Sequence, residues 1–132
     1  DLAVAYSRER VQFDRPIGSF QAVQHLCADM LTELELGRAG AYYALWAADD
    51  GDPAELHRAA TMAMAFAGDA FSRIGADAIQ VFGGVGYTWE HDAHLFYKRL
   101  LTLEHVNGTN AHHLEELMSI VLASPSSDIR TG

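Results

Sequence analysis

Apolar side chains recur at intervals of three and four residues along most of this chain, the spacing that places them on one face of an α-helix. The longest such stripe follows Ser19, a residue type that caps helix starts, and runs to about Asp50. It consists of Phe20, Val23, Cys27, Met30, Leu34, Gly37, Ala41 and Leu45. A helix of this length would extend over about 45 Å, which favours an antiparallel bundle of long helices.

A second long helix is predicted from Pro53 to about Phe82. Asp52 is expected to cap its start, and Glu55 occupies the position of a capping-box partner. Its apolar face consists of Ala60, Met64, Ala67, Phe71, Ile74, Ala78 and Val81. The many alanines, together with Gly68, predict that a neighbouring helix approaches closely.

Shorter elements flank the two long helices. A first helix ends near Val11 and a loop follows over 14–18; a short helix is predicted over about 91–103 and a last helix over about 109–123. The last helix is expected to bury Leu114, Leu117, Met118 and Val121. No strand-like alternation of useful length is present. The predicted fold is therefore all-α, an up-and-down four-helix bundle with an additional short C-terminal helix.

The chain of 132 residues is long enough for one domain, which we assign to residues 1–123, with a polar tail over 124–132. Its first residues, Asp1–Tyr6, have the pattern of the middle of an amphipathic helix. Neither a capping residue nor an initiator methionine precedes them. We therefore expect the chain to be a fragment of a longer protein.

Composition argues against several classes of function. The net charge is −9, with one lysine against eight arginines, whereas a protein that binds nucleic acid needs a basic face. The uncharged, apolar run over residues 59–68 is too short to span a bilayer. The single cysteine, Cys27, cannot form an internal disulfide and is expected to be a buried thiol, which favours a cytoplasmic location.

The loop after the first helix combines a cation, an aromatic ring and an amide in Arg10, Phe13 and Gln21. A guanidinium fork suits a phosphate or diphosphate, and an aromatic ring can cover a nucleotide base. The alternative is an ordinary surface arginine, with Phe13 closing the end of the bundle. The pattern alone leaves both interpretations open.

The second candidate is a glycine-rich turn, in which Gln80 is followed by Gly83, Gly84 and Gly86. Glycines let the backbone bend sharply and approach another group closely. The segment follows a helix rather than a strand, so the dinucleotide-binding fingerprint does not apply. From the pattern alone, it is either a nucleotide-contacting turn or a helix C-cap with a glycine linker.

Several histidines invite a search for a metal site. Those toward the C-terminus are His91, His94, His105, His112 and His113, with Glu115 and Glu116 nearby. A di-metal helical bundle needs Glu-x-x-His on facing helices, and Glu55 with His57, like Glu90 with His91, misses that spacing. We therefore predict no metal site.

Five segments occur in an order and spacing known from one family: Tyr6–Phe13, Pro16–Gln21, Ala67–Asp69, Gln80–Tyr87 and Trp89–Arg99. Together they resemble the C-terminal helical domain of the acyl-CoA dehydrogenase family, over nearly the whole chain. The resemblance implies a four-helix bundle that assembles into a tetramer, either homo- or hetero-oligomeric. It also implies that FAD is held across a subunit interface.

The resemblance assigns roles to particular residues. Arg10 corresponds to the family's arginine at the FAD diphosphate, Phe13 to its ring partner and Gln21 to its amide contact. The adenosine end is expected to meet the glycine turn of a neighbouring subunit. The full set of expected cofactor-binding residues is Arg10, Phe13, Gln21, Gln80, Gly83, Gly84 and Thr109.

The implied reaction is α,β-dehydrogenation of an acyl-CoA thioester, in which a carboxylate removes the α-proton while the flavin accepts the β-hydride. An electron-transfer flavoprotein is the expected type of electron acceptor. The isolated chain is expected to be inactive, because the family's middle β-domain carries most contacts to the flavin ring.

One position departs from the family pattern. Many members carry a catalytic glutamate in a Glu-Gly-Thr segment, and the corresponding residue here is Asn107, an amide that cannot act as a base. Ala111 likewise replaces a common flavin-contacting glutamine. Three explanations are open: a base upstream of Asp1, a non-catalytic flavin-holding subunit of a heterotetramer, or Glu104 acting instead. A ligand-free bundle used only for assembly is a further alternative.

Overall fold

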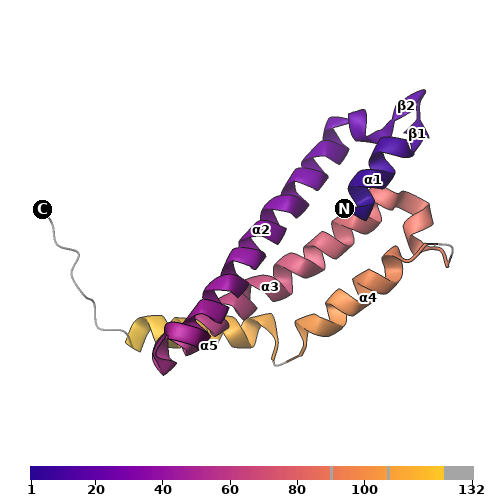
Figure 1. The fold of residues 1–132 in the computed structure, drawn as a ribbon. Coiled ribbons are helices and arrows are strands. Elements are labelled where there is room, and N and C mark those ends of the chain that lie inside the picture. The colour runs from indigo at the N-terminus through magenta and orange to yellow at the C-terminus, as the bar shows by residue number, and fades with distance from the viewer. Residues whose placement is uncertain (90, 107, 124–132) are drawn as a thin grey trace, which may run out of the picture.

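The computed structural model describes residues 1–89, 91–106 and 108–123. Within them lie five α-helices, two short 3₁₀ segments and one two-stranded hairpin (Figure 1). In chain order the elements are α1 (Leu2–Glu9), β1 (Val11–Gln12), β2 (Arg15–Pro16), η1 (Ile17–Ser19), α2 (Gln21–Asp50), α3 (Pro53–Phe82), η2 (Gly83–Tyr87), α4 (Ala93–Glu104) and α5 (Asn110–Ala123). The predicted polar tail over 124–132 lies outside the described residues.

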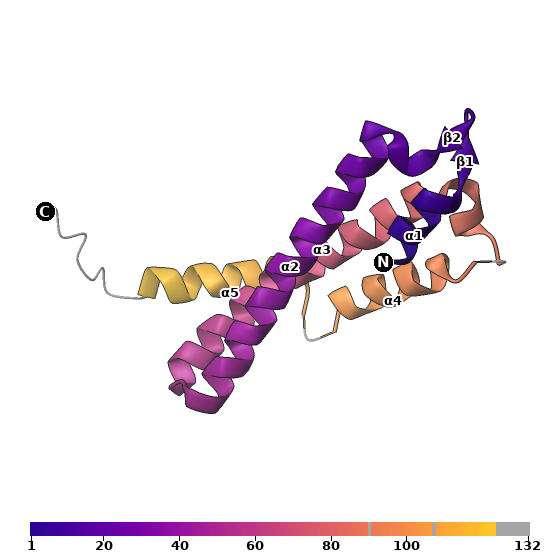
Figure 2. The ribbon, with the colours of Figure 1, turned by 45° about the horizontal axis from the view of Figure 1, so that its top comes forward.

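The described helices form the predicted all-α bundle. Helices α2 and α3 lie antiparallel along each other, α4 runs back along α3, and the short α1 packs against both α2 and α3 at one end (Figures 1 and 2). Helix α5 contacts the N-terminal half of α3 and points away from the bundle. The prediction of a helical bundle with an additional C-terminal helix is confirmed.

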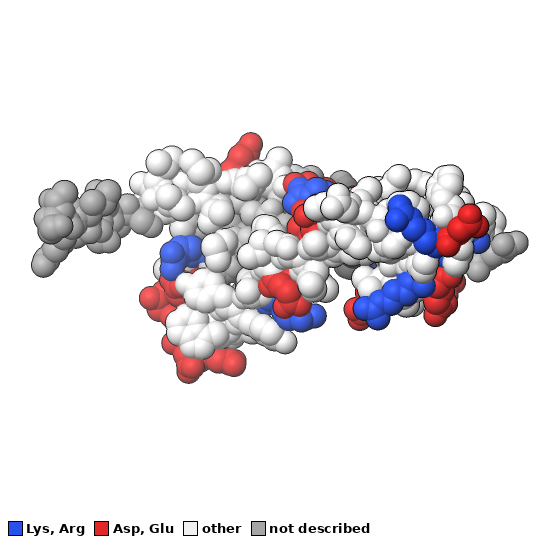
Figure 3. Space-filling view, turned by 90° about the horizontal axis from the view of Figure 1, so that it is seen from above, with Lys and Arg blue, Asp and Glu red and all other residues white. Residues whose placement is uncertain are grey.

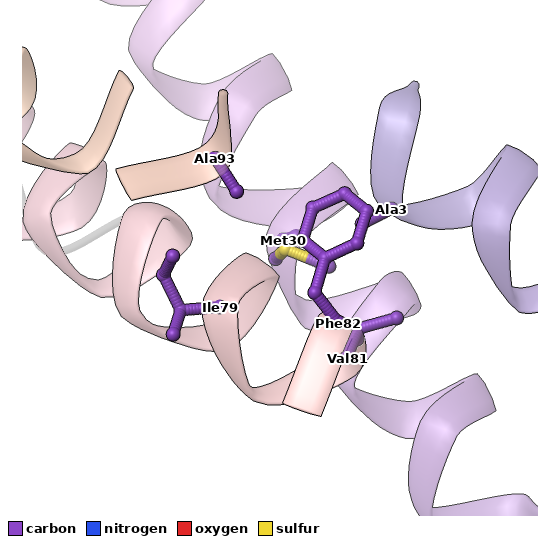
Figure 4. Packing of buried hydrophobic residues seen from close by; sticks show 6 residues of the cluster. All are labelled: Ala3, Met30, Ile79, Val81, Phe82 and Ala93. Atoms are coloured by element: carbon purple, nitrogen blue, oxygen red, sulfur yellow. The ribbon is translucent and has the colours of Figure 1, made fainter. Parts of the chain in front are cut away.

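Four helices meet in a core at the end of the bundle that holds α1. Figure 4 shows the cluster, whose members are Ala3, Met30, Ile79, Val81, Phe82 and Ala93. Next to this core, an open apolar groove of about 830 Å³ is lined by residues of α1, α2, α3 and α4. Cys27 lines this groove and is half-buried, not fully buried as predicted.

The buried side of α3 differs from the predicted one. Its buried residues include Ala59, Ala65, Ala70, Gly75 and Ile79, whereas most of the predicted face, such as Met64 and Phe71, is half-buried. The reason is that α3 contacts α1, α2, α4 and α5, so neighbours cover it from several directions. A single stripe does not describe a helix that lies at the centre of the fold.

The capping residue predicted from the sequence is correct for α3 and wrong for α2. Asp52 caps α3 as predicted, because its Oδ1 accepts hydrogen bonds from the backbone N–H groups of Ala54 and Glu55 at 2.8 and 2.9 Å. The prediction that Ser19 caps α2 is wrong. Ser19 lies in η1, where its hydroxyl donates to the carbonyl of Pro16 at 2.7 Å, and Phe20 occupies the cap position without a side-chain bond.

Much apolar surface remains uncovered on α2 and α5. The predicted stripe of α2 is exposed at Leu34 and Leu45, and on α5 the side chains of Leu114, Met118 and Val121 are 47–57% exposed. The predicted buried side of α5 is therefore wrong for this chain, since α5 packs on α3 through another side. Figure 3 shows large uncharged areas between scattered charges. Extensive exposed apolar surface is typical of a protein that associates with other chains.

Among the described helices, none is both long and apolar enough to cross a membrane.

Acidic side chains cluster around Arg73, where α2 and α3 pack against each other. Arg73 of α3 donates to Glu33 of α2 at 2.7 Å and to Asp69 at 2.5 Å. Burial raises the pKa of the nearby Asp77 carboxyl above its ordinary value, and the charges of Glu33 and Asp29 raise this pKa further, while Arg73 lowers it.

We expect Asp77→Asn to stabilise the protein slightly at pH 7, by no more than about 0.5 kcal/mol. Because the folded-state pKa lies above the unfolded-state value, the stability contributed by Asp77 is fully present below the unfolded-state pKa and is lost as pH rises through the folded-state pKa. The gain from Asp77→Asn should therefore shrink as pH falls from 7 toward 4 in urea unfolding. Asp69→Asn, which removes a partner of Arg73, should not stabilise; a destabilising Asp77→Asn at pH 7 would contradict the prediction.

Candidate functional site

A strained hairpin carries the first group of predicted site residues. Helix α1 ends at Glu9, with Arg10 as its C-cap, and β1 and β2 pair antiparallel, with Gln12 opposite Arg15. The two turn residues, Phe13 and Asp14, have φ angles of 53° and 62°, the left-handed conformation of a type I′ turn. This conformation is unusual for a bulky side chain such as phenylalanine. It places the Phe13 ring at the tip of the hairpin, where the residue is 86% exposed.

The hairpin gathers rings and cations on one small surface. The Phe13 ring lies edge-on to Phe20, with 6.1 Å between centroids, and the Arg15 guanidinium lies 4.1 Å above the Phe20 ring. Arg10 is exposed and forms no ion pair within the described part of the chain. Gln21 is exposed at the first position of α2. The hairpin thus offers an unpaired guanidinium and an open aromatic face to a ligand.

The sequence pattern had singled out Arg10, Phe13 and Gln21, but not the contributions of Arg15 and Phe20. The two-residue strands are too short to produce a visible alternation, so the sequence predicted a loop without strands. The signal that was present is the Asp14-Arg15-Pro16 segment. Aspartate tolerates the left-handed conformation, and proline fits an edge strand because it needs no hydrogen-bond partner.

The glycine turn carries the second group of predicted site residues. Gly83 ends α3 with a φ of 63° and a ψ of −143°, and its N–H donates to the carbonyls of Ile79 and Gln80. Gly83 is therefore the predicted C-cap, in a conformation that favours glycine. A Cβ atom added to Gly83 or Gly84 would meet no atom within 4 Å, so this surface is open to close approach.

Gly86, in contrast, is required for packing. A Cβ atom there would lie 2.9 Å from the Cβ of Phe82 and 3.2 Å from the carbonyl oxygen of Ile79. Gln80, one turn back on α3, is exposed. The three glycines of the turn therefore serve different purposes, and only Gly84 combines open surface with a φ outside the left-handed region.

The hairpin and the glycine turn lie at the same end of the bundle (Figure 1). An aromatic cluster lies between the elements that carry them: Phe82 packs 5.0 Å from the Tyr6 ring and 4.2 Å from the His91 ring. No hydrogen bond, ion pair or ring contact joins the two predicted groups within the described residues. The two predicted groups are therefore separate surfaces within this chain.

The remaining predicted residues lie near the start of α5. Thr109 caps that helix, because its hydroxyl accepts from the backbone N–H of His112 at 3.3 Å. Glu104 is half-buried at the end of α4 and accepts a hydrogen bond from the Ser72 hydroxyl at 2.5 Å. It lines a small cavity of about 290 Å³ between α3 and α4. Asn107, predicted to correspond to the family's usual glutamate, lies outside the described residues.

Comparisons with known proteins show the family of the chain. Residues 1–122 match the family described as acyl-CoA dehydrogenase, C-terminal domain, so the chain belongs to the acyl-CoA dehydrogenase family. It is 52% identical over 99 residues to the acyl-CoA dehydrogenase FadE34 of Mycobacterium tuberculosis, covering 75% of this chain and 14% of that protein. The family predicted from the sequence motifs is confirmed.

Two solved structures have the same fold. The ChsE4-ChsE5 complex from Mycobacterium tuberculosis superposes with a TM-score of 0.88 at 30% identity, over 95% of this chain and 34% of that chain. PigA with FAD and proline superposes with a TM-score of 0.85 at 28% identity, over 91% of this chain and 31% of that chain. The family is one of oxidoreductases, and its structures with bound FAD imply a flavin cofactor.

Proposed function

We propose that this chain is the flavin-binding and oligomerisation domain of an FAD-dependent acyl-CoA dehydrogenase, which catalyses α,β-dehydrogenation of an acyl-CoA thioester. The observation that carries the proposal is the hairpin, where a strained turn exposes the Phe13 ring. Arg10, which directly precedes β1, is exposed and has no ion pair among the described residues. The chain spans 14% of the length of FadE34 and about a third of the matched structures. The activity is therefore proposed for the whole protein.

The residues of the hairpin and of the turn fit the two ends of FAD. The Arg10 fork suits the diphosphate, the Phe13 ring can cover an adjoining ring, and Gln21 supplies an amide. On a second copy, Gln80 and the open backbone at Gly83 and Gly84 suit the adenosine end. Thr109 is proposed to contact the cofactor as well. When bound, FAD supplies the acceptor for a hydride from the substrate.

The proposed assembly is a tetramer whose interfaces cover the exposed apolar sides of α2 and α5. These sides include Leu45 and Trp46 on α2, and Met118 and Leu122 on α5. Exposed apolar area of this extent is expected to be covered by other chains or domains. We place the protein in the cytoplasm, in fatty acid or lipid β-oxidation, with an electron-transfer flavoprotein as the proposed electron acceptor.

A second candidate is a non-catalytic, flavin-holding subunit of a heteromeric dehydrogenase. Asn107 replaces the usual glutamate, and one carboxylate oxygen of Glu104 already accepts a hydrogen bond from the Ser72 hydroxyl. A complex of two differently named chains, ChsE4 and ChsE5, is among the structures with this fold. If the chain is a non-catalytic subunit, the catalytic base belongs to the partner chain. If the protein is itself the dehydrogenase, the base is proposed to lie in the part of the protein that precedes Asp1.

Anaerobic titration of the purified full-length protein with acyl-CoA thioesters of graded chain length tests the proposal. Loss of the oxidised flavin's visible absorbance on addition of acyl-CoA supports the enzyme. Retained flavin that is reduced only after co-purification with a second dehydrogenase chain supports the non-catalytic subunit. A full-length protein that elutes from gel filtration without flavin contradicts both.

A further inference from the structure

We propose that α5 carries a binding site for a divalent transition metal, formed by His112, His113 and Glu116. One ligand atom from each of these side chains lies within 4.8 Å of the others. Two imidazole nitrogens and one carboxylate oxygen form a donor set that suits Zn²⁺ and related ions, with a further coordination position open. None of the three ligands is among the proposed flavin-binding residues.

The spacing along α5 brings the three side chains together. His112 and Glu116 are four residues apart, and His113 and Glu116 are three apart, so both histidines neighbour the carboxylate on the helix surface. The two imidazole rings lie 5.3 Å apart between centroids, at an angle of 58°. A metal bound there would therefore link the first and second turns of α5.

His113 is the observation that points to a ligand. It is only 7% exposed, and neither Nδ1 nor Nε2 of its buried ring has a hydrogen-bond partner among the described residues. Leaving buried polar atoms unpaired is unfavourable, and native proteins rarely contain such atoms. A metal bound to one of these nitrogens would turn this unfavourable burial into a favourable interaction.

A third histidine supports the carboxylate. The Nε2 atom of His57, near the start of α3, lies 3.3 Å from the Oε1 atom of Glu116. A hydrogen bond to a metal-binding carboxylate fixes its orientation and increases metal affinity. His57 would thus connect the site on α5 to α3, and the bound metal would hold the two helices together.

The site also lies against the loop that leads into α5. Gly108 has a φ of 121°, and a Cβ atom there would lie 2.8 Å from Cδ2 of His112 and 3.2 Å from Nε2 of His113. Glycine therefore leaves the room that the two rings occupy. The same first turn is capped by Thr109 through the N–H of His112. A bound metal would fix this turn, and with it the position of Thr109.

No metal site is predicted from the sequence pattern, because the chain lacks Glu-x-x-His at the spacing of a di-metal bundle. Here the ligands follow one another on a single helix as His-His-x-x-Glu, and the carboxylate comes last. The contribution of His57, which is 59 residues before Glu116 in the chain, depends on how α5 packs on α3. The sequence alone does not provide that packing.

Zinc titration of the full-length protein tests the site. After treatment with a chelator, the protein is titrated with Zn²⁺ in competition with a fluorescent chelator, and with Co²⁺ while its visible absorption is recorded. We expect one ion per chain. His112→Gln and Glu116→Gln each remove a proposed ligand and should weaken Zn²⁺ binding by at least about tenfold. His57→Gln removes only the hydrogen bond to Glu116 and should weaken binding by about tenfold. His25→Gln, an exposed histidine on α2, is the matched control and should bind like the unchanged protein.

Thermal unfolding provides a second readout. A saturating concentration of Zn²⁺ should raise the melting temperature of the unchanged protein and of His25→Gln, but not of Glu116→Gln. The proposal is overturned if no saturable Zn²⁺ binding occurs below about 100 µM, or if His112→Gln and Glu116→Gln bind Zn²⁺ as the control does. Because His112 is exposed, its variant should retain the fold. Flavin content, measured in parallel, reports separately on the proposed function.

Discussion

Replacing Arg10 by alanine is expected to cost the full-length protein most of its flavin during gel filtration. A hydrogen bond to a charged group contributes about 1.5–3 kcal/mol, which corresponds to roughly 10- to 150-fold weaker binding when it is lost. The Arg10 side chain has no ion pair in the described part of the chain, and the backbone of Arg10, not its side chain, bonds Tyr6 and Ile17. The substitution should therefore remove flavin without disturbing the hairpin.

Absorbance ratios of flavin to protein after gel filtration measure the effect, and two variants control it. Arg38→Ala removes the same charge from an exposed pair with Glu35 on α2, and flavin content should not change. Arg10→Lys keeps the charge but loses the planar fork, so it should retain an intermediate amount. Equal flavin content in Arg10→Ala and Arg38→Ala would remove Arg10 from the cofactor site.

Two glycine variants test the other half of the site without changing charge. Gly83→Ala should destabilise the protein by about 1–2 kcal/mol, because the new residue must keep a left-handed φ. Gly84→Ala meets no atom within 4 Å and needs no such conformation, so its melting temperature should be unchanged. If the turn meets the cofactor of a second copy, Gly84→Ala should nevertheless reduce flavin content. A Gly84→Ala protein with full flavin content would contradict the role proposed for the turn.

Local sequence signals predicted the long helices well. The ends of α2 and α3 at Asp50, Pro53 and Phe82 follow from periodicity, from the Asp52-Pro53 start and from the glycines that follow. These signals act within a few residues, so they do not depend on which helix packs where. The motifs around Arg10 and Gln80 likewise identified both exposed surfaces.

Features that depend on neighbours were not predictable in this way. Which side of α5 is buried depends on how that helix lies on α3, and the predicted apolar side, including Met118, remains exposed. The sequence placed Ser19 as a cap, but a 3₁₀ turn before α2 uses its hydroxyl. The group around His113 escaped notice for the same reason, because burial of that ring is a property of the packing.

Gly75→Leu is expected to lower the free energy of unfolding by about 2 kcal/mol or more, and the melting temperature by several degrees. Gly75 is buried where α4 crosses α3, and a Cβ atom there would lie 2.6 Å from Cδ2 of Tyr97 and 3.0 Å from Cδ1 of Leu100. A leucine side chain cannot fit unless the side chains of Tyr97 and Leu100, or α4 itself, move away. The higher helix propensity of leucine stabilises the fold by less than about 1 kcal/mol, so the steric effect should prevail.

Gly68→Ala is the matched control, because Gly68 lies two turns earlier on the same helix. A Cβ atom there would lie 3.5 Å from Cγ of Glu104, an ordinary contact, so this variant should be stabilised by up to about 1 kcal/mol. If Gly75→Leu unfolds at the same temperature as Gly68→Ala, the close approach of α4 is wrong. If Gly75→Leu unfolds at a lower temperature, flavin content should fall together with stability. The reason is that α4 ends at Glu104, which bonds Ser72, and precedes Thr109, the proposed cofactor contact that caps α5.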